Sequence, residues 1–137
     1  METYTIATAI IRNNNEYLIA KRAPTKKFAP NQWEFISGFI DDGETAEETI
    51  LREIKEELGI DGKIDNSSSP FYVIDDEGKW TIAPFLIEVN TRDIKINLED
   101  HSEIKWVIAD DLEKYPDLKP FLENRGVKNF YANTDKR

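Results

Sequence analysis

The chain has 137 residues, of which 39% are hydrophobic and 33% are charged, a composition that predicts a globular protein with a polar surface. Acidic residues outnumber basic ones by 27 to 18, and the net charge of −9 argues against binding to a nucleic-acid backbone. The absence of cysteine excludes disulfides, a cysteine-ligated zinc site and a cysteine nucleophile. This length favours a single domain over residues 1–137.

No stretch of the sequence is apolar over the roughly 18 residues that a membrane-spanning helix needs. The first residues, Met1-Glu2-Thr3, are acidic where a secretory signal peptide would be basic. We therefore expect a cytoplasmic protein without a membrane partner.

The first third of the chain alternates short β-branched segments with turns. Residues 5–11 predict a strand, the asparagines at 13–15 a turn, and residues 17–20 the returning strand of a hairpin. Residues 23–32 hold two prolines and two lysines and indicate a loop, and residues 33–36 predict another short strand.

Residues 45–58 carry the clearest helical pattern. Thr45 and Glu48 have the spacing of a capping box, in which each side chain satisfies a backbone N–H of the first turn. Gly59 supplies a residue that adopts the left-handed conformation at a helix end. The helix is therefore expected to end at Leu58.

Strands dominate the second half. Residues 70–74 and 80–89 predict antiparallel strands around a turn at 75–78, and residues 103–108 predict a further strand. Residues 112–124 predict a second helix, with Pro116 and Pro120 in its first turn or at a break. The elements together favour an α/β fold with a mixed sheet flanked by helices. Four aromatic residues of this region and the preceding strand could stack a base, but we expect them in the core: Trp33, Tyr72, Trp80 and Phe85.

The helix at 45–58 places acidic residues beside its apolar face. At about 100° per residue, one stripe is apolar and predicted to be buried, and it comprises Ala46, Ile50, Leu51, Ile54 and Leu58. Glu53, Glu56 and Glu57 share the adjacent arc, with Cβ atoms roughly 5–6 Å apart, so their charges repel. They form either a solvated acidic face or a set of oxygen ligands for a hard divalent cation such as Mg²⁺.

Residues 38–60, GFIDDGETAEETILREIKEELGI, resemble the signature of the Nudix hydrolase family. The pattern is Gly, five residues, Glu, seven residues, then Arg-Glu-aliphatic-x-Glu-Glu-x-Gly-aliphatic, and every fixed position matches. Outside this Nudix box, Lys21-Arg22, Trp33-Glu34-Phe35 and the segment 106–112 resemble the MutT-type branch. The resemblance implies an α/β/α sandwich with a mixed sheet and a metal-binding helix after a loop. It also implies hydrolysis of a nucleoside diphosphate linked to another moiety, with Mg²⁺ or Mn²⁺ as cofactor.

The resemblance also assigns expected roles to individual residues. Metal ligands would be Glu53, Glu56, Glu57 and a backbone carbonyl of Ser37 or Gly38, and Arg52 would hold a box carboxylate in place. Glu44 would fix the loop against the helix. Many relatives place a further acidic residue where this chain has the loop at 100–103, and the candidates are Asp100, as an additional ligand or base, and Glu103, as a base. The nucleotide pocket would be formed by Arg22, Phe28, Glu34, Phe35, Ile36 and Ser37. His101 has a pKa suited to a base, but a histidine in a loop is more often solvated.

Two departures from the MutT-type pattern concern substrate recognition. Relatives have Pro-Gly-Gly-Lys before the box, whereas this chain has Ile36-Ser37-Gly38-Phe39, so the phosphate-contacting lysine is absent there. The base-reading asparagine is also missing, and the nearest polar candidate is Asp117, which could bind a purine edge or cap the second helix.

The expected activity is Mg²⁺-dependent hydrolysis of a nucleoside triphosphate, ordinary or oxidised, to a monophosphate and pyrophosphate. The alternatives are hydrolysis of ADP-ribose or a nucleotide sugar, and a nucleotide-binding module without activity. The intact box carboxylates favour catalysis. The expected partner is a small nucleotide, and the sequence leaves open a monomer or a homodimer.

Overall fold

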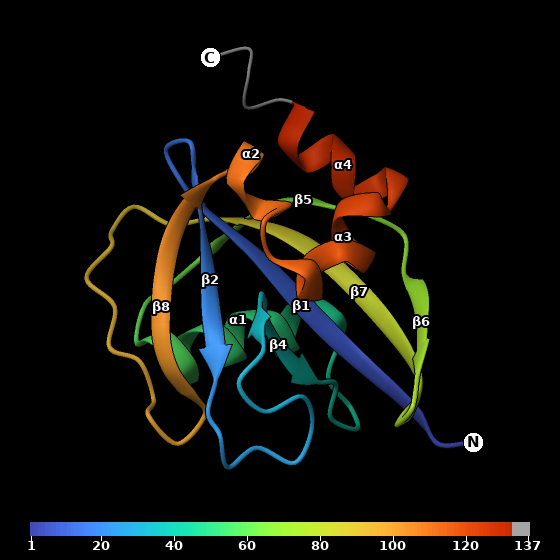
Figure 1. Ribbon diagram of the computed structural model, residues 1–137. Helices are drawn as coiled ribbons and strands as arrows, with labels where there is room; N and C mark the ends of the chain where they lie inside the picture. Colours follow the sequence, from blue (N-terminus) through green and yellow to red (C-terminus); the bar gives the residue numbers. More distant parts are fainter. Residues whose placement is uncertain (133–137) are drawn as a thin grey trace.

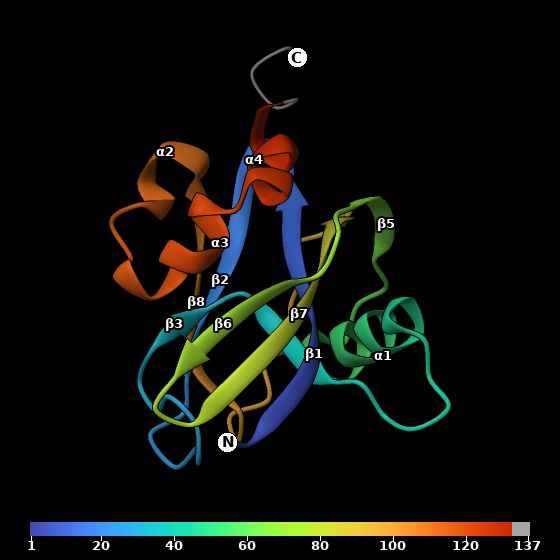
Figure 2. The same ribbon diagram turned by 90° about the vertical axis from the view of Figure 1, so that its right-hand side faces the viewer.

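Strands of one mixed sheet carry helices on both faces in the computed structural model, which describes residues 1–132 (Figures 1 and 2). The strands are β1 (Thr3–Asn13), β2 (Glu16–Arg22), β3 (Trp33–Glu34), β4 (Ile36–Phe39), β5 (Lys63–Ser67), β6 (Phe71–Asp75), β7 (Gly78–Glu88) and β8 (His101–Ile108). The helical elements are α1 (Ala46–Leu58), α2 (Ala109–Leu112), the 3₁₀ turn η1 (Pro116–Leu118), α3 (Lys119–Glu123) and α4 (Arg125–Ala132). The layers confirm the predicted α/β class.

Strands β1 and β7 form the parallel centre of the sheet and pair from Thr3 with Lys79 to Arg12 with Glu88. The remaining pairs are antiparallel: β5 and β6 pair with β7, β3 and β8 pair with β2, and β2 and β4 pair with β1. Both polarities in one sheet confirm the prediction that it is mixed.

The hairpin of β1 and β2 opens soon after its turn. The two strands pair at Arg12 with Tyr17 and at Asn13 with Glu16, and β4 then takes the place beside β1 from Ile6 to Ala9. The predicted strand at 33–36 is therefore two strands, because the chain passes from β2 to β1 at Phe35. This divergence places β4 beside β1, and Ser37, Gly38 and Phe39 of β4 line the candidate site.

Helix α1 packs on one face of the sheet through Ile50, Ile54 and Leu58 (Figure 2). The predicted capping box of Thr45 and Glu48 is present, and Gly59 ends the helix at φ 70°. The prediction that Leu51 is buried is wrong, since its side chain is 38% exposed. Leu51 lies at the border of the stripe, on the side that the sheet does not reach.

The second face is covered by several short helices, and the single helix predicted at 112–124 is wrong. Pro116 and Pro120 each lie in the first turn of a new element, η1 and α3, because proline lacks the N–H that a continuing helix needs. Asn124 then accepts a hydrogen bond from the backbone N–H of Val127 at 3.1 Å and begins α4. Phe130 of α4 is buried on the sheet, so this polar end of the chain contributes to the core.

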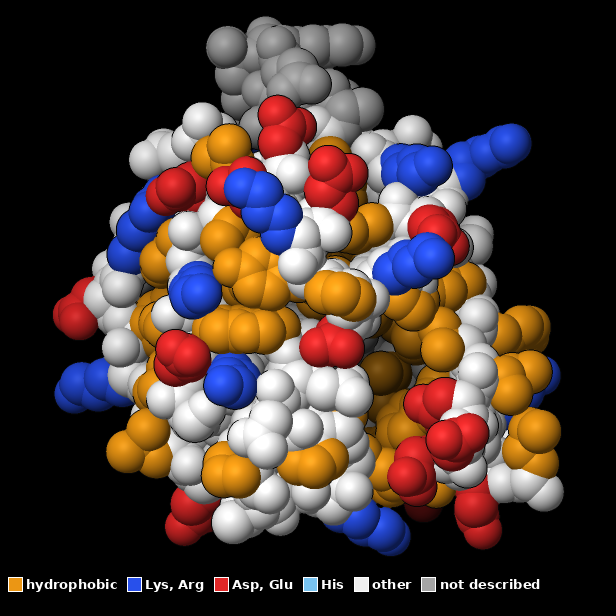
Figure 3. All heavy atoms as spheres, in the orientation of Figure 1, with side chains coloured by type: hydrophobic (Ala, Val, Ile, Leu, Met, Phe, Trp, Pro, Cys, Tyr) orange, Lys and Arg blue, Asp and Glu red, His pale blue; other side chains and the backbone are white. Residues whose placement is uncertain are grey.

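Strand β5 escapes prediction because its sequence, KIDNS, is polar and mostly exposed. It is held by backbone pairing with β7, and Ile64 packs on the core. On the face that α3 and α4 cover, acidic side chains gather toward the β6–β7 turn (Figure 3), where Asp75, Asp76 and Glu77 lie. Within residues 1–132, no helix combines the length and apolarity that crossing a bilayer requires.

Candidate active site

A pocket opens where β1, β4, α1 and the loop at 23–32 meet. Its wall contains acidic side chains from α1, two cations from β2 and the loop, and three aromatic rings. The lining residues are Ile6, Arg22, Lys26, Phe28, Ser37, Gly38, Phe39, Glu53, Glu57 and Trp80. Charged groups and aromatic rings therefore share one cavity.

Gly38 brings the backbone of β4 against Glu53. A Cβ at this position would lie 2.3 Å from Glu53 Cγ and 2.4 Å from Glu53 Cδ, which is closer than two nonbonded carbon atoms can approach. Burial raises the pKa of Glu53, and the charges of Glu57 and Glu56 raise it further, whereas Arg52 lowers it. A carboxylate in this position is stabilised by an added cation.

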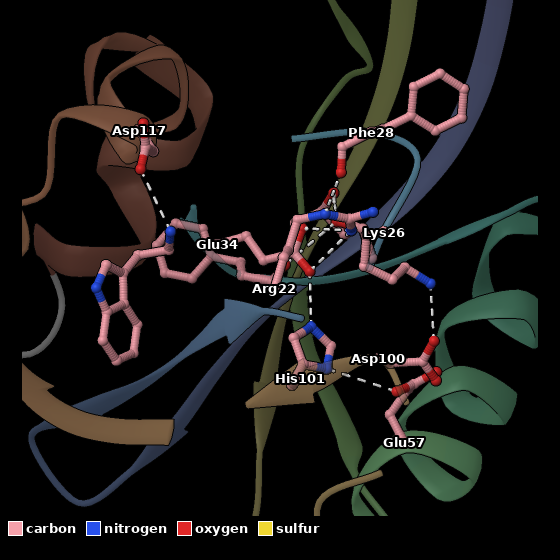
Figure 4. A network of polar contacts seen from close by, with 12 residues as sticks. Arg22, Lys26, Phe28, Glu34, Glu57, Asp100, His101 and Asp117 are labelled. Atoms are coloured by element: carbon pink, nitrogen blue, oxygen red, sulfur yellow. Dashed lines mark hydrogen bonds and ion pairs between the residues drawn. The ribbon is translucent and has the colours of Figure 1, made fainter. Parts of the chain in front are cut away.

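Glu57 carries a buried oxygen, Oε2, that has no hydrogen-bond partner in the structure. It forms a long ion pair with His101, whose Nδ1 lies 3.6 Å away, and Asp100 also contacts Glu57 (Figure 4). An unsatisfied buried carboxylate oxygen is costly, and oxygen donors are the ligands that Mg²⁺ and Mn²⁺ prefer. These residues therefore fit a divalent metal ion.

Arg52 organises the carboxylates of the helix and the loop before it. Its Nε and Nη2 donate to the two carboxylate oxygens of Glu44 at 2.8 and 2.9 Å, and its Nη1 donates to Glu53 and Glu56 at 3.1 Å each. Glu44 also accepts from the hydroxyl of Thr49 at 2.9 Å. Hydrogen bonds with Arg52 lower the pKa of Glu44 to about 2.

In the described part of the chain, no three acidic or histidine side chains are gathered as a ready-formed metal centre. Arg52 Nη1 is shared between Glu53 and Glu56, whereas Glu53 and Glu57 line the pocket. Mg²⁺ commonly shares its coordination shell between one or two carboxylates, water and substrate phosphates, so it does not need a complete protein cage.

A chain of polar contacts joins Glu57 to the loop at 23–32 (Figure 4). His101 Nε2 lies 2.7 Å from Glu34 Oε2, and Arg22 donates from Nη1 to both oxygens of Glu34 at 3.2 Å. Arg22 Nε donates to the carbonyl of Phe28 at 2.7 Å. The expectation that His101 is solvated is wrong, since it is 5% exposed. Burial lowers the pKa of His101, but its contacts with Glu34 and Glu57 raise it to about 9.

Aromatic rings form the other end of the pocket. Trp80 stacks on Tyr4 with ring centroids 4.3 Å apart, and Phe28 meets Trp80 edge-on at 5.3 Å. Phe39 lies 6.1 Å from Trp80 and is 47% exposed. We call Tyr4, Phe28, Phe39 and Trp80 the aromatic wall. The expectation of a core position therefore fails for Trp80, and also for Tyr72, which is 65% exposed, but holds for Phe85.

A family model described as the NUDIX domain matches residues 3–125. The chain belongs to the Nudix family. It is 32% identical over 127 residues to the nucleoside triphosphatase NudI of Escherichia coli O81 (strain ED1a), a match that covers 84% of this chain and 89% of the relative.

Solved structures share the fold of this Nudix protein. An Ap4A hydrolase from C. elegans superposes with a TM-score of 0.78 at 20% identity, covering 98% of this chain and 99% of that one. A MutT protein from Methanosarcina mazei Go1 gives a TM-score of 0.71 at 22% identity, covering 98% and 94%. The family and the NudI relative show that the chain is a hydrolase acting on phosphoric anhydride bonds, as its sequence predicts. Nudix hydrolases generally use divalent metal ions.

The structure brings most of the predicted site residues of this Nudix hydrolase together. Box residues Gly38, Glu53 and Glu57 line the pocket with Ser37, Arg22 and Phe28. Glu34 lies behind them and contacts Arg22 and His101. Asp100 lies beside Glu57 and pairs with Lys26. Arg52 and Glu56 adjoin the pocket through their contacts with Glu53 and each other.

Four predicted residues lie elsewhere. Phe35 and Ile36 do not line the pocket, because successive strand residues face opposite sides and each is buried in a different hydrophobic cluster. Glu103 is exposed on β8, opposite Lys21 of β2, and does not line the pocket. The carboxylate of Asp117 accepts a hydrogen bond from the backbone N–H of Trp33 at 3.3 Å (Figure 4). Asp117 therefore does not cap α3, and it does not line the pocket.

Sequence reasoning missed Lys26, Phe39 and Trp80 as lining residues. Two lysines in a loop and a tryptophan in a strand are common features that carry no signal by themselves. The pocket brings these three residues together from separate parts of the chain, since Lys26 lies in the loop at 23–32, Phe39 in β4 and Trp80 in β7.

Proposed function

We propose that this Nudix hydrolase cleaves nucleoside triphosphates to a monophosphate and pyrophosphate with Mg²⁺ or Mn²⁺. The observation that carries the proposal is the aromatic wall in the same pocket as Glu53 and Glu57. Aromatic rings stack on nucleobases, and carboxylates hold the cation that neutralises a polyphosphate. The similarity to NudI, named a nucleoside triphosphatase, supports the same class of substrate.

The residues that would hold the metal are Glu53, Glu56 and Glu57, together with Asp100 and a carbonyl of Ser37 or Gly38. When bound, the cation supplies charge neutralisation and an activated water. Hydrolysis would form a bond between the oxygen of a water molecule and phosphorus and break the bond from that phosphorus to the bridging oxygen, which leaves with the other product. The proton of the water passes to a carboxylate of this group. Glu103 is not proposed as the base, because it is exposed on β8.

Arg52 and Glu44 would act through the ligands. Within residues 1–132, four of the five side-chain hydrogen bonds of Arg52 fix the orientation of Glu53 and Glu56 relative to Glu44. A rigid arrangement matters because in-line attack on phosphorus depends on positioning. We therefore assign both residues a positioning role.

The test is chromatography of products from a panel of ordinary and oxidised nucleoside triphosphates, ADP-ribose and nucleotide sugars, each with Mg²⁺ and with EDTA. We expect triphosphates to release a monophosphate and pyrophosphate with Mg²⁺ and to release neither with EDTA. Faster cleavage of ADP-ribose or a nucleotide sugar would replace the triphosphate assignment with that substrate. Folded protein that cleaves nothing in the panel would contradict the proposal.

A further inference from the structure

Two cations line the pocket, Arg22 and Lys26. Neither comes from the segment Ile36-Ser37-Gly38-Phe39 that precedes the helix, which contains no lysine. A polyphosphate bound beside Glu53 and Glu57 requires positive charge, and the protein as a whole carries a net charge of −9. Among the described residues that line the pocket, these two can supply that charge beside the metal.

The guanidinium group of Arg22 already donates hydrogen bonds within the protein. Its Nη1 donates to both oxygens of Glu34, and its Nε donates to the carbonyl of Phe28. Its side chain is 18% exposed. These bonds fix the loop that carries Phe28, and a move toward substrate would break them.

Among residues 1–132, the ammonium group of Lys26 pairs with Asp100 alone. Its Nζ lies 2.8 Å from Asp100 Oδ1, and its side chain is 31% exposed (Figure 4). Asp100 lies beside Glu57, whose Oε2 has no hydrogen-bond partner. Lys26 therefore places its charge next to the carboxylates that fit a metal ion, on a flexible stem in an open loop.

We propose that Lys26 exchanges partners during binding: it pairs with Asp100 in the free protein and with phosphate oxygens of the substrate when the metal–nucleotide complex enters. The same lysine would then compete with a divalent cation for the carboxylate group in the absence of nucleotide. This inference rests on the proposed function and adds to it the residue that contacts the polyphosphate.

Partner exchange gives the substitution Lys26→Met two effects of opposite sign. Binding of Mn²⁺ without nucleotide should become tighter, by about five-fold for a loss of one partly exposed like charge. Binding of a non-hydrolysable nucleoside triphosphate in saturating Mn²⁺ should become weaker, by about 10- to 100-fold for a lost charge-assisted hydrogen bond. Lys26→Arg should restore most of the nucleotide affinity.

Lys114→Met is the matched control, since Lys114 also pairs with an aspartate, Asp111, at 3.0 Å, and it does not line the pocket. It should leave both affinities within about two-fold, the range of a screened surface charge. Calorimetric titration measures both affinities, and thermal unfolding checks that each variant is folded.

Weaker binding of both Mn²⁺ and nucleotide by Lys26→Met would show a purely structural role and overturn the inference. Unchanged nucleotide affinity would overturn it as well. Neither measurement requires turnover. A wild-type protein that binds the metal–nucleotide complex without hydrolysing any triphosphate would refute the proposed function alone, and the two opposite shifts would still support the role of Lys26.

Discussion

Arg52 and Glu44 form a two-pronged ion pair, in which Nε and Nη2 of the arginine donate to separate oxygens of the glutamate at 2.8 and 2.9 Å. The pair joins the loop before α1 to the helix surface that carries Glu53 and Glu56. Paired hydrogen bonds of this kind set the orientation of both groups. The pair therefore connects the stability of the loop with the geometry of the candidate metal ligands.

Glu44→Gln should make the thermal stability of the protein vary less with pH in the acid range. The pKa of Glu44 is lowered from its ordinary value of 4.5 to about 2 in the folded protein. Its ionised form therefore contributes stability above pH 4.5, and this contribution is lost as the pH falls toward 2. Thermal unfolding of both proteins between pH 7 and pH 2 measures this. The variant should melt at a lower temperature at pH 7, and the two melting temperatures should converge with acid. A constant difference across this range would contradict the assignment.

Gly38→Ala should leave the protein folded and lower kcat by about 100-fold, the effect of displacing a reacting group by about 1 Å. The added Cβ would overlap Glu53 Cγ and Cδ, and the flexible glutamate side chain has to swing away. Steady-state kinetics together with a melting curve separate these effects.

Gly43→Asn is the matched control for this glycine. Gly43 lies in the loop before α1 with φ 84°, has open space around its Cβ position, and asparagine tolerates this backbone conformation. Normal turnover by Gly38→Ala would contradict the close approach of Glu53 to β4.

Trp80→Ala and Phe28→Ala should each raise KM for a nucleoside triphosphate by about 5- to 150-fold, since one stacked base is worth about 1–3 kcal/mol. Because the rings lie at the end of the pocket away from Arg52, kcat should change less than KM. Tyr72→Ala removes an exposed ring from β6 and should leave both constants unchanged. Equal effects of all three substitutions would show that loss of stability, not stacking, is responsible.

Local signals in the sequence predict the framework of the site well. The capping box of Thr45 and Glu48, the end at Gly59 and the acidic arc of α1 depend on residues within one helix, and all are present. The burial of Ile50, Ile54 and Leu58 follows from the helical period. Leu51 fails because it lies at the edge of the stripe, where the position of the sheet decides burial.

Features that depend on contacts between residues far apart in the chain cannot be predicted from this sequence. His101 is buried because β8 lies beside β2 and brings it against Glu34, which is 67 residues away in the chain. Asp117 meets the backbone of Trp33 across 84 residues. Lys26 reaches Asp100 through the fold of a loop whose sequence indicates no regular structure. Composition and periodicity describe neighbours along the chain, so they carry no information about these pairs.

The central claim is that the carboxylates of α1 beside Gly38 carry out metal-dependent hydrolysis. The most direct measurement compares Glu57→Gln with Glu103→Gln, using release of pyrophosphate from the best triphosphate substrate in saturating Mg²⁺. Glu57→Gln should retain its melting temperature within a few degrees and lose at least about 100-fold in kcat, and Glu103→Gln should match the wild type. A folded Glu57→Gln variant with wild-type turnover would contradict the account.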